Sequence, residues 1–192
     1  MARTVPYGEG RDLLIRATVS VVAERGLRGL TFRSAAERAG VSNTLVARHF
    51  GTREALLEAA LDWATERTIQ STSLLDLASE EQFAAALMHS LTVEPELQAF
   101  QYEMIWEARR STQYRERIAR LYDRYIEAVA ESLTRFGLTR DVPQAARTLF
   151  ATLDGLVLEH LAGVDRDTMR DSLRRVWISL NRLKHADAAA QE

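Results

Sequence analysis

The sequence predicts an all-α protein of about nine helices, because apolar residues recur every three or four positions along most of the chain. No segment shows the sustained apolar–polar alternation, bounded by hairpin turns, that indicates β-strands. Glycines, prolines and N-capping residues divide the helical pattern into separate segments. We therefore expect a small N-terminal helical module, joined by a shared helix to a larger helical bundle.

Three helices are predicted in the N-terminal module, and the first of them runs from about 10 to 25. Thr31 can cap the second helix, and Gly40 follows its last turn, where a left-handed backbone costs least. Ser42 offers another N-cap, and a third helix then runs to Phe50. Two short helices joined by a tight glycine-containing turn are typical of a helix-turn-helix, whose second helix fits a DNA major groove.

The third helix has two different faces. Val46 and Phe50 are four residues apart, which suits burial. A fully buried helix would have no polar face, and a merely solvated helix usually carries more Glu and Lys. Taken alone, the pattern fits a DNA-reading helix and a purely structural hairpin equally well. The outward face would carry Asn43, Thr44, Ala47 and Arg48, with Leu45 at its border.

The run from Thr31 to Leu57 resembles the signature of the tetracycline-repressor (TetR) family. A threonine opens the hairpin, Ala-Gly-Val-Ser forms its turn, a phenylalanine closes the third helix, and Thr-Arg-Glu-Ala-Leu begins the next one. Among the departures, Ala47 stands where the family usually has a phosphate-binding tyrosine, and Arg53 replaces a lysine. The resemblance implies a homodimeric repressor that binds a palindromic operator in double-stranded DNA and responds to a small-molecule effector.

Charge is distributed unevenly along the chain. Residues 1–53 hold nine arginines and four acidic residues, a balance of +5, although the whole chain carries −2. The remaining residues therefore carry −7. A basic end on an acidic body is typical of a DNA-binding domain followed by a domain with another task.

The composition excludes several other classes of protein. Cysteine is absent, which rules out disulfides and thiolate metal sites and fits a cytoplasmic location. The first ten residues lack the apolar core of a signal peptide, and no apolar run is long enough to cross a membrane. We expect no membrane contact. Arg3 lies on this N-terminal arm, where disorder is a simpler expectation than contact with DNA.

Six further helices are expected after the hairpin. The first of them, at about 53–69, follows the hairpin directly and continues past the point where the N-terminal module should end. We therefore predict a DNA-binding domain at 8–68 and a ligand-binding and dimerisation domain at 75–188. The tail from 186 onwards is expected to fray. The other helices are predicted at about 79–94, 95–110, 112–136, 141–162 and 166–185.

The helices of the larger domain show no enzymatic motif. They contain no HExxH metal site, no glycine-rich phosphate loop and no nucleophile–base pair in sequence. Glu103 and Glu107 are one turn apart and could hold a metal, but an exposed helix face is the simpler interpretation. We predict neither catalysis nor a metal or cofactor.

Aromatic side chains recur along the larger domain, and we interpret Phe100 and Phe150 among them as core. Tyrosines in a bundle usually need partners for their hydroxyls, which a cavity with polar groups supplies. The resemblance implies such a cavity. The run 100–114 is loosely similar to the choline-responsive, BetI-like branch of the family, which permits a cationic or polar effector. The candidate effector-binding residues are Tyr102, Trp106, Tyr122 and Tyr125.

The last two long helices carry more apolar surface than one neighbouring helix can cover. This surplus predicts a four-helix interface between two copies of the chain. The alternative is that both apolar stripes pack inside one subunit. The residues expected at the dimer interface are Leu153, Leu156, Val157, Val176, Trp177 and Leu180.

We interpret the sequence as a ligand-responsive repressor. Arg48 has the reach to donate two hydrogen bonds to a guanine edge, and Ser42 and Arg53 should hold phosphates. The alternative is an all-helical ligand-binding or scaffold protein that does not bind DNA, for which Leu45 and Ala47 are the best arguments. The residues expected to contact DNA are Thr31, Arg33, Ser42, Asn43, Thr44, Leu45, Arg48, His49 and Arg53.

Overall fold

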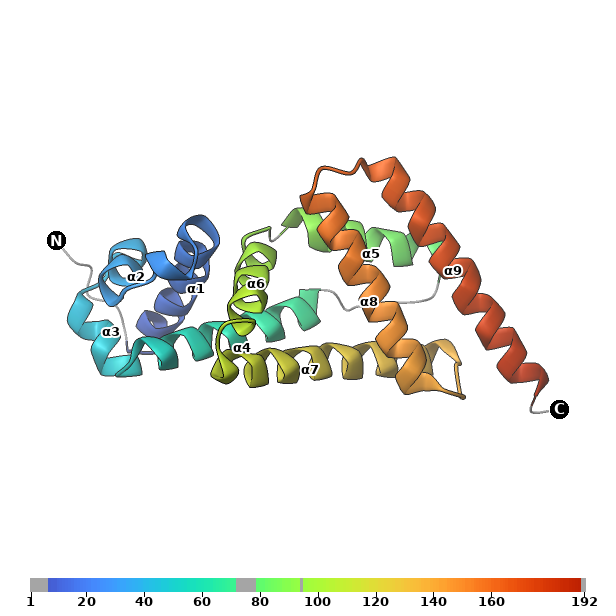
Figure 1. Ribbon diagram of the computed structural model, residues 1–192, viewed down its shortest axis with the longest axis horizontal. Helices are drawn as coiled ribbons and strands as arrows, with labels where there is room; N and C mark the ends of the chain where they lie inside the picture. The colour runs from blue at the N-terminus through green and yellow to red at the C-terminus, as the bar shows by residue number, and fades with distance from the viewer. Residues whose placement is uncertain (1–6, 72–78, 94, 191–192) are drawn as a thin grey trace. The chain divides into compact units, whose positions relative to one another are not determined.

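The computed structural model describes residues 7–71, 79–93 and 95–190, and all regular secondary structure within them is helical (Figure 1). This confirms the predicted all-α class. None of the described helices is long and apolar enough to cross a membrane. The predicted arm with Arg3 and most of the break before the fifth helix lie outside the described residues. The elements are α1 (Tyr7–Arg25), η1 (Leu27–Gly29), α2 (Phe32–Ala39), α3 (Asn43–Phe50), α4 (Arg53–Ser71), α5 (Glu80–Val93), α6 (Pro95–Ala108), α7 (Thr112–Phe136), α8 (Val142–Leu161) and α9 (Arg166–Ala189).

The chain forms two compact units. The first contains Met1–Thr68 and Glu94–Ile118, and the second contains Ile69–Val93 and Ala119–Glu192. Both α4 and α7 therefore contribute residues to each unit. The predicted larger domain at 75–188 includes α6 and the start of α7, which in the structure belong to the first unit.

The core of the first unit is built from α1 to α4 together with α6. Its fully buried side chains include Leu14 and Val22 of α1, Val46 of α3, Leu57 of α4 and Phe100 of α6. Burial of such side chains contributes roughly 1.5–3 kcal/mol each to the stability of the unit. The helix-turn-helix therefore shares one apolar core with α6.

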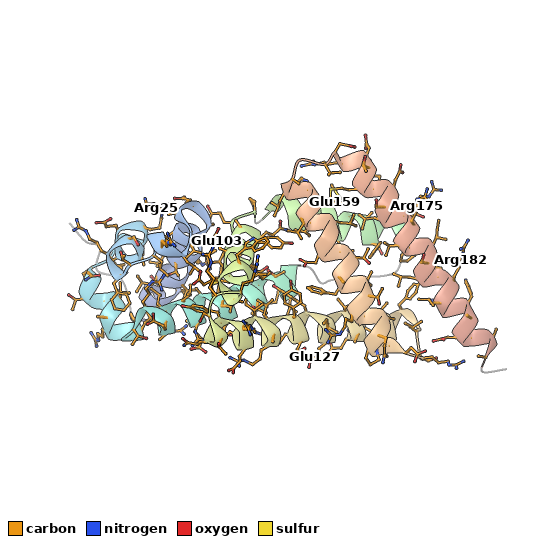
Figure 2. All side chains as sticks on the ribbon, viewed as in Figure 1. Arg25, Glu103, Glu127, Glu159, Arg175 and Arg182 are labelled. Carbon is orange, nitrogen blue, oxygen red and sulfur yellow. The ribbon has the colours of Figure 1, made fainter. Side chains whose placement is uncertain are left out.

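Two close contacts hold α6 against α1. The Ser20 hydroxyl donates to the Glu96 carboxylate at 2.6 Å. Further along, Glu103 Oε2, labelled in Figure 2, lies 3.3 Å from the position that a Cβ on Gly26 would occupy. Gly26 also has a φ of 67°, so any side chain at this position would be strained. Glycine at the end of α1 thus permits the close approach of α6.

The helix-turn-helix begins and turns as the sequence predicts. A reciprocal capping box closes the start of α2, because Ser34 N donates to Thr31 Oγ1 at 3.0 Å and Thr31 N donates to Ser34 Oγ at 2.9 Å. Gly40 ends α2 in a left-handed conformation, with φ 69° and ψ 27°. Ser42 occupies the N-cap of α3, but its side chain makes no capping hydrogen bond.

The core of the second unit is formed by α5, the later turns of α7, α8 and α9. Phe83 of α5, Leu133 of α7 and Met169 of α9 are fully buried in it. Trp177 of α9 packs against Phe83 and Phe136, with ring centroids 5.9 and 5.5 Å away. The neighbouring helices α8 and α9 (Figure 1) therefore bury part of their apolar stripes inside this unit.

The C-terminal end of α9 differs from the prediction. The helix continues to Ala189, although we expected the chain to fray from residue 186. The Asp187 carboxylate accepts hydrogen bonds from the backbone N–H groups of Thr139 and Arg140, both at 2.8 Å. These backbone bonds, first of all the one from Thr139, lower the pKa of Asp187. The last turns of α9 are thereby tied to the turn before α8, a long-range contact that helical periodicity does not reveal.

Candidate nucleic-acid interface

The outward face of α3 is the one that the sequence predicts. Asn43, Thr44, Ala47 and Arg48 are all exposed, whereas Val46 on the opposite side is fully buried. An exposed helix surface with an amide, a hydroxyl and a guanidinium can present hydrogen-bonding groups to base edges and phosphates. Ser42 is exposed at the start of the same helix.

The inner side of α3 packs against the start of α1. Leu45 Cδ2 lies 3.1 Å, and His49 Nε2 3.7 Å, from the position that a Cβ on Gly10 would occupy. The Arg11 guanidinium lies 5.6 Å from the centre of the Phe50 ring, within the range of a cation–π interaction. Leu45 and His49 were both expected to contact DNA, and in the structure both are half-buried on this side. They help to fix α3 on α1.

Thr31 and Arg33 lie exposed at the beginning of α2. The Thr31 hydroxyl is part of the capping box. Arg33 Nε donates to Glu37 Oε1 at 2.8 Å, one helical turn along, and this hydrogen bond raises the pKa of Arg33. Arg33 is therefore a permanent positive charge beside the first turn of α2, close to the amide groups that such a helix end presents.

Arg53 has a structural task in addition to its charge. Its Nε donates to the carbonyl of Leu30 at 2.9 Å, and an Nη donates to the carbonyl of Leu27. These bonds join the first residue of α4 to η1, the short link before α2. Three of the five guanidinium N–H groups remain after these two bonds. The sequence predicts the charge of Arg53 but not its hydrogen bonds to the backbone.

Two of the four candidate effector residues surround one ring in the second unit. Tyr122 and Tyr125 of α7 contact Phe150 of α8, edge-on at 5.3 Å and stacked at 5.5 Å between ring centroids. The Tyr122 hydroxyl donates to Asp154 at 3.3 Å. Burial, followed by the charge of Asp154, raises the pKa of Tyr122 to about 12. Phe150 and Asp154 were not among the predicted site residues, although their i, i+4 spacing places them on one helix face.

The other two candidate effector residues lie one turn apart on α6, in the first unit. Trp106 is 57% exposed, and the Arg109 guanidinium lies 5.9 Å from the centre of its ring. A cavity of about 290 Å³ lies beside Trp106, Arg109 and Arg110. Tyr102 is half-buried. An indole with this exposure offers a flat apolar surface to a ligand.

The six residues expected at a dimer interface lie in or against the core of the second unit. Leu153, Leu156 and Leu180 are buried in the single chain, and Val157, Val176 and Trp177 are partly buried against them. Four other large apolar side chains, which we did not predict at the interface, remain exposed on the same two helices. These are Leu158 (44%), Leu161 (51%), Ile178 (42%) and Leu183 (49%).

Two family descriptions match the chain. Residues 78–179 match the C-terminal domain of tetracyclin repressor-like proteins, and residues 14–60 match the bacterial regulatory proteins of the tetR family. The first match alone covers more than half of the 192 residues. The two matches follow one another along the chain, as an N-terminal and a C-terminal part.

Among curated proteins, the chain is similar to HTH-type transcriptional regulators named BetI. It is 38% identical to BetI of Paraburkholderia phytofirmans over 63 residues, which cover 33% of this chain and 32% of that protein. The match thus spans about a third of that relative. It is 27% identical to BetI of Paraburkholderia phymatum over 175 residues, which cover 85% of this chain and 87% of that protein.

Solved structures share the fold over nearly the whole chain. A TetR-family transcriptional regulator from Rhodococcus sp. superposes with a TM-score of 0.75 at 25% identity, over 92% of this chain and 99% of that one. The multidrug binding protein EbrR, complexed with imidazole, superposes with a TM-score of 0.63 at 27% identity, over 90% and 97%. The chain therefore shares its helical fold with a TetR-family regulator and with a multidrug binding protein.

Proposed function

The chain belongs to the TetR family of bacterial regulatory proteins, and we propose that it is a transcriptional repressor that binds a palindromic DNA operator as a homodimer. In this proposal a small-molecule effector releases the protein from the operator, in the cytoplasm where the DNA lies. The observation that carries the proposal is the exposed face of α3, where Asn43, Thr44 and Arg48 surround a buried anchor at Val46. The basic N-terminal 53 residues, with a charge of +5, favour approach to DNA.

The test of DNA binding is selection of genomic fragments by the purified protein. We expect enrichment of a palindrome whose half-site centres lie roughly 34–36 Å apart, because two symmetric recognition helices read it. A variant with Asn43, Thr44 and Arg48 changed to alanine should enrich nothing, while its circular dichroism spectrum stays that of the wild type.

A non-DNA-binding ligand protein is the second candidate, and two observations favour it. Ala47 presents a methyl group where the resemblance implies a phosphate-binding tyrosine, and Arg53 already uses two donors on backbone carbonyls. Both reduce the number of groups that face a phosphate. Fragment selection without any enriched palindrome, by folded wild-type protein, would favour this candidate.

We propose that the homodimer forms through α8 and α9. Exposed leucine and isoleucine side chains are unfavourable in water. Burying them stabilises a protein by roughly 25 cal/mol per Å² of apolar surface removed from water. Leu153, Leu156 and Leu180 already serve the core of the subunit. Val157 and Val176 would lie behind the interface. Its direct contacts would come from Leu158, Leu161, Ile178 and Leu183.

For the effector, we propose a small organic molecule bound by the candidate aromatic residues. Tyr122 and Tyr125, with the newly identified Phe150 and Asp154, combine aromatic faces with a hydroxyl and a carboxylate. Similarity to a multidrug binding protein complexed with imidazole supports a small organic ligand. Tyr102 and Trp106, which lie on α6 in the first unit, stay candidate effector residues of that unit. Because α4 and α7 each contribute residues to both units, either helix can carry a ligand-induced shift to the helix-turn-helix.

A further inference from the structure

A second cavity in the first unit is separate from the candidate effector residues. Its volume is about 170 Å³. It is bounded by η1, the first residue of α4, the end of α6 and the first turn of α7. None of Tyr102, Trp106, Tyr122 and Tyr125 lines it. The residues that do so are Leu27, Arg28, Arg53, Glu107, Arg110 and Tyr114.

The lining of this cavity is strongly basic. It holds three guanidinium groups, those of Arg28, Arg53 and Arg110, and a single carboxylate, that of Glu107. The formal charge around the cavity is therefore +2. The three like charges come from η1, from the first residue of α4 and from the turn between α6 and α7, and their mutual repulsion is relieved when an anion lies between them.

The ion pairing inside the chain leaves these charges largely uncompensated. Arg110 Nη1 lies 3.8 Å from Glu107 Oε2 and Arg53 Nη1 lies 3.9 Å from Glu54 Oε1, so both ion pairs are longer than a hydrogen bond. Arg28 makes no hydrogen bond or ion pair with any residue in the described part of the chain. Arg53 is held in place by its bonds to the carbonyls of Leu27 and Leu30, so its remaining donors are fixed in direction. Arg53 is thus preorganised, and Arg28 and Arg110 keep all their donors for a ligand, although Arg110 lies in a long ion pair with Glu107.

From this arrangement we propose that the cavity binds a small oxyanion, a carboxylate or a phosphate. Guanidinium groups recognise both through paired, charge-assisted hydrogen bonds. The volume corresponds to about six water molecules of roughly 30 Å³ each, which suits inorganic phosphate or a dicarboxylate of about four carbons. The buried faces of Leu27 and Tyr114 give the cavity an apolar wall, which a short carbon chain can contact.

A bound oxyanion would link η1 to the turn between α6 and α7. Since η1 leads directly into α2, the anion would restrain the helix-turn-helix relative to α6 within the first unit. The chain would then respond to two ligands of different chemistry, an effector at the aromatic residues and a small anion here. This inference does not depend on whether the protein binds DNA.

The test is calorimetric titration of the full-length protein, without DNA, with inorganic phosphate and with succinate. Ionic strength is held constant with sodium chloride, because simple screening would otherwise change with each addition. We expect saturable binding of at least one of the two anions with one site per chain. A double variant, R28Q with R110Q, should weaken that binding at least about tenfold, since it removes two charge-assisted partners.

A matched control uses Arg115→Gln, which removes an exposed charge from the first turns of α7 outside the cavity. This variant should bind the anion as the wild type does. Arg53 is left intact because its backbone bonds hold η1, and both Arg28 and Arg110 are exposed, so the double variant should fold. The proposal is overturned if neither anion binds saturably, or if R115Q weakens binding as much as the double variant.

A final arm separates a free anion from a DNA phosphate, which has the same chemistry. The salt dependence of DNA binding is measured for the wild type and for the double variant, because its slope counts the phosphates that are contacted. We expect equal slopes. A smaller slope in the double variant, combined with no binding of free phosphate or succinate, would assign the cavity to DNA and refute the proposal.

Discussion

Arg48 is the side chain on which base recognition by α3 should depend most. It is exposed on the same face as Asn43 and Thr44 and has the length to reach a guanine edge. We expect Arg48→Ala to weaken operator binding by about 1–3 kcal/mol and to relax the preference at one base pair. Fluorescence anisotropy with the selected operator and single-base variants measures both effects. Arg120→Ala, which removes an exposed charge from α7, should change neither of them.

Tyr122 should make stability depend on pH in the alkaline range. Burial and the Asp154 charge raise its pKa to about 12 in the folded chain, against about 10 in an unfolded chain. The folded state therefore holds the hydroxyl proton over a range in which the unfolded state has lost it. The stabilisation is complete below about pH 10 and is lost as the pH rises towards 12. Urea unfolding of wild type and Tyr122→Phe across this range tests it, and curves that stay parallel would contradict the assigned pKa.

For single residues, the sequence predicts which side chains are exposed better than it predicts which distant residues they contact. The division of α3 into a buried and an exposed side follows from its period of 3.6 residues, and the structure agrees with it. The bond between Arg53 and the Leu30 carbonyl joins residues 23 positions apart. No local pattern encodes such a pair, so the sequence suggested only a charge at this position.

Among the elements, η1 owes its position to α4. The carbonyls of Leu27 and Leu30 lie outside any α-helix, and both accept a hydrogen bond from Arg53. Arg53→Ala should lower the free energy of unfolding by about 2 kcal/mol, since partly buried hydrogen bonds to a charged donor are lost. Arg33→Ala is the control, because the Arg33 side chain is 84% exposed and its loss should cost less than about 0.5 kcal/mol. Equal unfolding midpoints in urea for both variants would refute the structural role of Arg53.

Helix positions were predictable where local signals agree. The bounds Thr112–Phe136 of α7 were predicted correctly because a long apolar stripe ends at a glycine. The start of α5 was predicted at about residue 79, and in the structure the Ser79 side chain accepts a hydrogen bond from Gln82 N at 3.2 Å. The end of α9 was not, since Asp187 bonds to residues almost 50 positions away. Local chemistry determines where a helix can begin, and tertiary contacts decide how far it persists.

For the whole molecule, periodicity identified the apolar stripes of α8 and α9 but not their partners. Each apolar stripe is wider than one neighbouring helix can cover. Its inner part packs in the core of the subunit, and its outer part is left for the surface of a partner. We predicted Leu156 and Leu180 in the outer part, and the structure buries both in the core of the second unit. Only the packing of α5 and α7 against these helices determines which residues remain exposed.

The exposed part of these stripes leads to a prediction about assembly. Ile178→Glu should convert the dimer into a monomer without unfolding it, because the side chain is 42% exposed in the single chain and would meet its copy in the dimer. Leu156→Glu should instead unfold the second unit, since it places a charge in the core. Sedimentation velocity and circular dichroism distinguish the two results. A stable Ile178→Glu dimer would remove this surface from the interface.

Regulation, finally, requires that the effector and the operator compete through the conformation of the dimer. Two recognition helices match a palindrome only at a separation of roughly 34–36 Å, so a ligand that favours another separation opposes DNA binding. Such a ligand must bind the two conformations with different affinities, and a coupling of about 1–3 kcal/mol would weaken operator binding about 5–150-fold. Linkage then demands that saturating operator weakens the ligand by the same factor.

We expect calorimetric titration of an effector, found by thermal-shift screening, to show this reciprocal loss. The coupling should shrink when Phe150→Ala removes the ring that Tyr122 and Tyr125 share. An effector with the same affinity in the presence and absence of operator would show that release proceeds by another route.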